Sequence, residues 1–170
     1  MKRVALALVL AGFSSFTFAN SSQCLAQKYD GYIDASLNWY GELVEIAVEK
    51  QPELKEVGEW FLNGRKNHFE LNRQAVHTFL VEDPSKVNTN VSVESWLQLE
   101  QHDVKALTGR TDELGKLAQV SFSDRQSKPH EKNYDLRTAF ADLLSHPQHI
   151  NDALTRYNEA VSQVAEIQCD

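Results

Sequence analysis

The chain contains only two cysteines, Cys24 and Cys169, which lie near opposite ends of the sequence. This spacing matches neither a C-x-x-C redox pair, nor a haem-attachment C-x-x-C-H, nor half of a zinc-binding pattern. Two thiols of an exported chain meet an oxidising compartment and normally pair there. The sequence therefore predicts a structural disulfide between Cys24 and Cys169, with two free or intermolecular thiols as the alternative.

The histidines offer one weak candidate for a metal site. Asp142, His146 and His149 are spaced i, i+4 and i+7, which would place them on one face of an unbroken helix and allow Zn²⁺ or Cu²⁺ binding. Pro147 interrupts this stretch and marks a helix boundary. We therefore interpret the three residues as a capping and exposed loop segment. We expect no metal and no other cofactor.

Motifs for catalysis are missing from the sequence. There is no G-x-S-x-G, H-E-x-x-H, Glu-x-x-His or phosphate-binding glycine loop. His68 falls on a helical seam and is interpreted as a hydrogen-bonded core or boundary residue. Arg65, Lys66 and Arg73 form a small basic patch that we interpret as surface salt-bridge partners. The sequence thus favours a protein that is not an enzyme.

The first predicted helix, from Ser21 to Gln51, carries two adjacent apolar rows rather than one. One row is aliphatic, and the other contains the aromatic or large residues Tyr29, Tyr32, Trp39 and Leu43. Tyrosine and tryptophan are enriched at binding hot spots, so this second row is a candidate binding surface. The alternative is that the row is core, covered by the loop after Glu82 or by the polar linker near Pro129.

Helical periodicity continues along most of the remaining chain. It predicts helices over residues 53–81, 92–122, 134–144 and 147–168, with a polar linker at 123–133 and a break at Gly109 as an alternative to one long third helix. An even number of antiparallel helices brings the two cysteines to one end. The expected fold is therefore all-α: an antiparallel up-and-down four-helix bundle over residues 20–170, closed by the disulfide between the chain ends.

A short stretch of the last predicted helix resembles a known family. The sequence Arg-Tyr-Asn-Glu-Ala-Val at residues 156–161 is similar to part of the terminal helix of LemA-family bundle proteins. The resemblance covers six residues and implies a helical bundle. It implies no functional residue.

The N-terminus has the layout of a secretory signal peptide. Lys2 and Arg3 precede an apolar run from Val4 to Phe13, and small residues follow up to Ala19. We expect cleavage after Ala19, which would make residues 1–19 the signal peptide and place the protein in the periplasm or outside the cell. The apolar run is too short for a membrane anchor.

Cleavage would leave a strongly acidic protein. The whole chain has 17 basic and 24 acidic residues, a net charge of −7. Losing Lys2 and Arg3 leaves 15 against 24, or −9. Such a surface repels nucleic-acid phosphates and anionic membranes and attracts basic partners. The expected function is an exported binding protein of the inhibitor, immunity-factor, adaptor or chaperone type with a protein partner. The alternative is a small-ligand-binding or metal-binding bundle.

Overall fold

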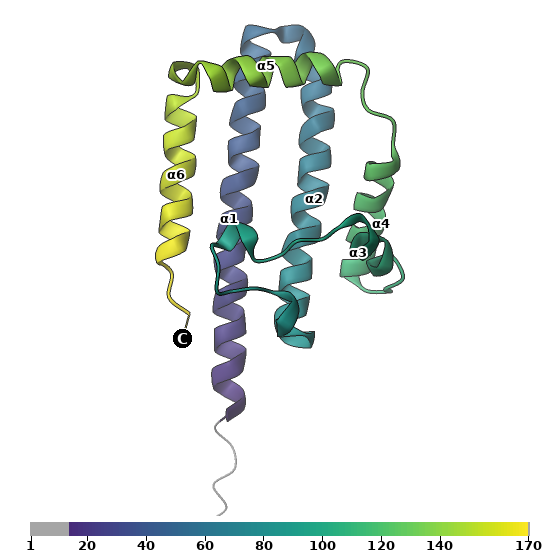
Figure 1. Cartoon of the computed structure of the whole chain (residues 1–170), viewed down its shortest axis with the longest axis vertical. Coiled ribbons are helices and arrows are strands. Elements are labelled where there is room, and N and C mark those ends of the chain that lie inside the picture. The colour runs from purple at the N-terminus through teal and green to yellow at the C-terminus, as the bar shows by residue number, and fades with distance from the viewer. Residues whose placement is uncertain (1–13, 170) are drawn as a thin grey trace, which may run out of the picture.

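A computed structural model describes residues 14–169 of the chain, and two long antiparallel helices form its centre (Figure 1). These are α1 (Ser14–Lys50) and α2 (Lys55–Glu82). Pro52 opens the short 3₁₀ turn Pro52–Leu54 between them, because proline cannot donate to an ongoing helix yet suits the first position of a new one. Residues 1–13 of the predicted signal peptide lie outside the described residues.

The final helix returns along α1 and brings the two cysteines together. Helix α6 (Asn151–Glu166) packs on α1, and Cys24 and Cys169 form a disulfide with their Cα atoms 5.6 Å apart. Lys28 adds a second tie, because its Nζ donates to the carbonyl oxygens of Ala165 at 3.0 Å and Ile167 at 2.7 Å. Carbonyls at a helix C-terminus lack partners inside the helix, and a lysine satisfies them well. The predicted disulfide is confirmed.

The third predicted helix is not continuous. A 3₁₀ turn at Val93–Ser95 and an extended segment lead to α3 (Gln101–Leu107), and α4 (Glu113–Gln126) follows. Helix α3 begins with a capping box formed by Glu100 and Asp103. Asp112 caps α4 by accepting from the amide of Gly115, where a Cβ atom would clash with the carbonyl of Arg110. The break at Gly109, which the sequence left as an alternative, is the arrangement found.

The segment between α2 and α3 contributes apolar side chains to the core. Val87, Val93, Trp96 and Leu97 are all buried, and Trp96 donates from Nε1 to the carbonyl of Val91 at 3.0 Å. The apolar residues of this segment therefore pack into the core although most of the segment is not helical. The apolar pattern here covers too few residues to distinguish a buried helix from a buried loop.

Helix α5 (Asn133–Ser145) lies across the end where α1 turns into α2 (Figure 1). Its buried residues Leu136, Ala139 and Leu143 join Leu54 and Val57 in a separate apolar cluster at this end. The helix matches the predicted stretch 134–144. The sequence pattern does not predict that it lies across the ends of α1 and α2.

The fold is all-helical over residues 14–169, where no strand is found and six α-helices of unequal length occur. The regular four-helix up-and-down arrangement is not confirmed, because the third quarter of the chain is divided into α3 and α4 and because α5 crosses the others. Among the helices described, none combines the length and apolarity needed to span a membrane.

Replacing Cys24 by Ser is expected to lower the free energy of unfolding by about 4–5 kcal/mol in the loop-entropy model, because the open chain regains denatured-state entropy. Urea denaturation of the variant, beside wild type with and without reductant, measures the loss. The Cys24→Ser/Cys169→Ser double variant is the control and should match reduced wild type. Two titratable thiols in native protein, or stability indifferent to reductant, would contradict the prediction.

Candidate functional site

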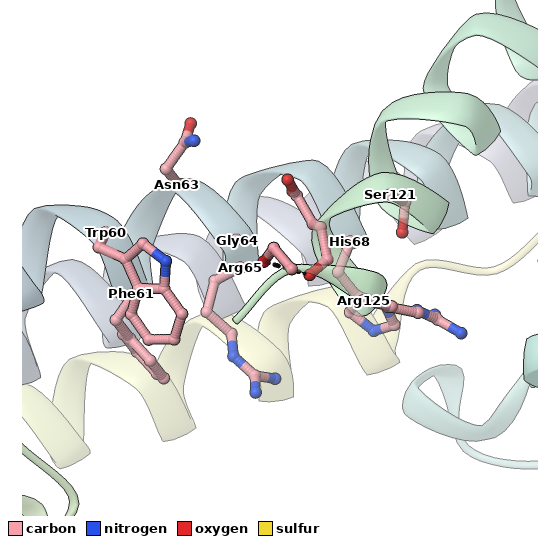
Figure 2. A pocket seen from close by; sticks show the side chains of 10 residues that line it. Trp60, Phe61, Asn63, Gly64, Arg65, His68, Ser121 and Arg125 are labelled. Carbon is pink, nitrogen blue, oxygen red and sulfur yellow. Dashed lines mark hydrogen bonds between the residues drawn. The ribbon is translucent and has the colours of Figure 1, made fainter. Parts of the chain in front are cut away.

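A half-open pocket of about 320 Å³ lies between α2 and α4 (Figure 2). Helix α2 contributes Trp60, Phe61, Arg65 and His68 to its lining. The C-terminal turn of α4 contributes Asp124 and Arg125. Spacings of three and four place Phe61, Arg65 and His68 on one side of α2. Packing of α4 against α2 supplies the opposite wall.

Arg65 lies against aromatic rings instead of a carboxylate. Its guanidinium carbon is 5.2 Å from the ring centroids of both Tyr40 and Phe61, which is a cation–π arrangement. The arginine–carboxylate ion pairs found in residues 14–169 use Arg73, Arg110 and Arg156. Neither arginine of the pocket takes part in them. The interpretation of Arg65 as a salt-bridge partner is therefore corrected.

His68 is held neutral beside two arginines. Burial, followed by the positive charges of Arg125 and Arg65, lowers the pKa of His68 to about 4. Desolvation and like charge both disfavour the imidazolium form. At neutral pH the ring therefore adds no charge to the pocket.

The contacts of His68 fix which ring nitrogen carries the proton. Nη2 of Arg125 is 3.3 Å from Nδ1 of His68, and a guanidinium can only donate, so Nδ1 accepts. The proton of the neutral ring is then on Nε2, which lies 3.4 Å from Nδ2 of Asn72; because both atoms would be donors, the oxygen and nitrogen of the Asn72 amide are assigned the other way round. An amide oriented with its oxygen toward Nε2 accepts this proton and gives a partner to the buried Asn72 Oδ1, which otherwise lacks one.

Asp124 is the acidic member of the pocket. Its Oδ2 accepts from Nδ2 of Asn67 at 2.6 Å, which holds the carboxylate against α2. Arg125 extends past it toward Oε1 of Gln101, 3.4 Å from its Nη1. Two guanidiniums, one carboxylate and a neutral imidazole leave the pocket with a net charge of about +1, by the side-chain charges expected at neutral pH. The chain around it has a net charge of −7.

The aromatic row predicted as a binding surface is mainly core. Tyr29 is 1% exposed and Leu43 is 4% exposed. The Tyr29 ring stacks on Trp96 with centroids 6.0 Å apart, and Trp39 packs 5.8 Å from Tyr157 of α6. Tyr32 is partly buried against the same core. Tyr29 and Leu43 thus belong to the core, which is the alternative that the sequence left open, and the segment after Glu82 is one of the elements that cover this row; Tyr32 and Trp39 are half-buried.

The weak metal candidate is an exposed helix end. Nδ1 of His146 lies 3.2 Å from Oδ1 of Asp142, and the His146 and His149 rings are 6.3 Å apart. Helix α5 ends at Ser145, and the turn Pro147–His149 follows. Across residues 14–169, no group of three or more His, Cys, Asp or Glu side chains is arranged to hold a metal ion.

The sequence did not reveal this pocket, because its two walls are far apart along the chain. Arg65 and His68 lie in the predicted helix 53–81, whereas Asp124 and Arg125 lie in the stretch predicted to be a linker. The continuation of α4 to Gln126 places them beside α2. The one signal in the sequence was the spacing of Phe61, Arg65 and His68 at i, i+4 and i+7, which places all three on one side of a helix.

Comparison with known proteins gives no match: no family model, no curated protein and no solved structure is similar to this chain. The six-residue likeness at 156–161 therefore remains a local one.

Replacing Tyr29 by Ala is expected to destabilise the protein by about 3–5 kcal/mol, because it removes a buried ring that stacks on Trp96 and leaves a cavity. Tyr134→Ala is the matched control, since Tyr134 is 78% exposed, and should change stability by less than about 0.5 kcal/mol. Thermal or urea denaturation measures both. Equal losses in the two variants would show that Tyr29 is not core.

Stability of the wild type should fall relative to His68→Gln as the pH drops from 7 to 4.5. The folded pKa of His68, about 4, lies below its ordinary value of 6.5, so the unfolded chain binds the proton first and acid favours unfolding. The full difference approaches about 3 kcal/mol below pH 4, from roughly 1.4 kcal/mol per pKa unit. Urea denaturation at several pH values measures it. Parallel profiles for the two proteins would contradict the assignment.

Proposed function

We propose that this chain is an exported, non-enzymatic binding protein that captures a small anionic ligand in the pocket between α2 and α4. The observation that carries the proposal is the pair Arg65 and Arg125, which line one pocket and form no ion pair with a carboxylate among residues 14–169. A volume of about 320 Å³ lies within the range typical of small-molecule sites.

The two pocket arginines keep their guanidiniums free of ion pairs within residues 14–169. Acidic residues outnumber basic ones by 24 to 17, so carboxylate partners are plentiful. A guanidinium gains most from bidentate pairing with a carboxylate or phosphate. Arg65 instead rests on Tyr40 and Phe61, which leaves hydrogen-bond donors for a ligand. An anion supplied from outside would complete the charge balance of the site.

The protein-partner hypothesis has lost its main support. It rested on an exposed aromatic row, and Tyr29 and Leu43 of that row are buried. The small-ligand alternative is therefore preferred.

Export is part of the proposal. The signal-like residues 1–19 support it, and the Cys24–Cys169 disulfide is compatible with a periplasmic or extracellular location. We regard the scaffold as a modified up-and-down bundle with α1, α2, α4 and α6 as its upright helices. The packing of α6 on α1 and of α4 on α2 supports this view.

Replacing either pocket arginine by Gln should weaken anion binding by about tenfold or more, because a hydrogen bond to a charged group contributes roughly 1.5–3 kcal/mol. Isothermal titration with acetate, benzoate, phosphate and sulfate at pH 7.5 measures affinities. Lys66→Gln is the matched control: it removes a charge from the next, exposed position on α2, outside the pocket, and should bind nearly as wild type does.

Two outcomes would overturn the proposed function. One is that none of the four anions binds to wild-type protein. The other is that Arg65→Gln and Arg125→Gln, shown by circular dichroism to be folded, bind the anions as tightly as Lys66→Gln does.

A further inference from the structure

We propose that the ligand of the α2–α4 pocket is a small aromatic carboxylate: a single flat ring bearing one negative charge. This inference rests on the proposed function and specifies its ligand. It follows from the charge of the pocket, from its aromatic wall and from its size.

The charge of the pocket matches a monoanion. Asp124 offsets one of the two guanidiniums, and it is fixed in place by Asn67 at 2.6 Å. A doubly charged phosphate would gain from both arginines yet approach the Asp124 carboxylate, and like charges at short range are unfavourable. A carboxylate brings one charge and a planar pair of oxygens, which suits the fork of a guanidinium.

One side of the pocket is aromatic and accessible. Trp60 is 38% exposed, which is high for a large apolar ring, and Phe61 lies next to it. Figure 2 shows both rings on one side, His68 and Arg125 on the other, and the Arg65 side chain between them. A ligand ring against Trp60 and Phe61 would therefore direct its carboxylate toward the guanidiniums.

The size of the pocket suits a small ligand. Its volume of about 320 Å³ is near the lower end of the range of roughly 300–1,000 Å³ for ligand sites. A free aliphatic acid such as acetate would leave the aromatic side unfilled.

His68 acts in this arrangement as a positioning residue. Its Nδ1 accepts from Nη2 of Arg125 at 3.3 Å, which directs that side chain over the pocket while leaving other guanidinium donors available. Because the ring is neutral at pH 7, with its pKa lowered to about 4 by burial and the two arginines, it makes this contact without adding a third positive charge.

The test is a titration of the full mature protein at pH 7.5 with four probes: benzoate, acetate, benzyl alcohol and phenyl phosphate. Benzoate should bind about tenfold or more tightly than acetate, because the ring adds buried apolar area and aromatic contact. Benzyl alcohol, which has the ring without the charge, should bind at least about tenfold more weakly than benzoate. Phenyl phosphate, largely dianionic at this pH, should also bind more weakly.

Variants separate the ring from the charge. Trp60→Leu should lower benzoate affinity about threefold to tenfold, from the roughly 0.5–1.5 kcal/mol of an aromatic pair, and leave acetate unchanged. Arg125→Gln should weaken both acids alike, and Lys66→Gln should weaken neither. Because Trp60 is partly exposed, its variant is expected to fold, and circular dichroism checks this.

The outcomes distinguish the two proposals. If acetate, benzoate and phenyl phosphate bind equally well and all depend on Arg65 and Arg125, the aromatic inference is overturned and the anion site stands. Insensitivity of benzoate binding to Trp60→Leu overturns the inference as well. If no charged probe binds, the proposed function itself fails.

Discussion

The apolar surface of α1 extends around more than one side of the helix, and the other elements are arranged as they are because all of it must leave water. Helix α2 covers the row that contains Ile33, which is fully buried. The segment at 93–97 covers Tyr29 through Trp96, and α6 covers Trp39 through Tyr157. An aromatic side chain buries roughly 150–250 Å², so each of these elements removes a sizeable apolar area of α1 from water.

Helix α6 packs on the rest of the fold mainly along α1. Its start is anchored by Ile150 in the apolar cluster beneath α5. Its end is held by the disulfide and by Lys28 on the carbonyls of Ala165 and Ile167. The disulfide acts mainly by lowering the conformational entropy of the denatured chain. Lys28 instead stabilises the folded C-terminus of the helix. Together they keep Trp39 covered.

Sequence periodicity predicted the elements whose apolar residues repeat over many turns. It placed both ends of α2, α5 and α6 within four residues and the end of α1 within one, whereas α1 begins at Ser14 and not at Ser21. The paired cysteines identified the contact between the two ends. Its prediction of one helix between Ser92 and Phe122 was wrong, because Val93, Trp96 and Leu97 are buried in the core by a segment that is not an α-helix. The pocket was missed for a related reason: Arg65 and Arg125 become neighbours only through the packing of α4 on α2, which local spacing does not encode.

The composition of the pocket supports a functional interpretation. His68 is a largely buried, neutral imidazole beside two positive charges, and neither Arg65 nor Arg125 forms an ion pair with a carboxylate in residues 14–169. Elsewhere in residues 14–169 three arginines lie on carboxylates, among them Arg110 on Glu82 and Asp112. Departures from local optimisation of this kind concentrate at sites retained for function. An anion between the guanidiniums would screen their repulsion and give both of them hydrogen-bond acceptors, so the charges of this pocket are arranged to favour an anionic complex.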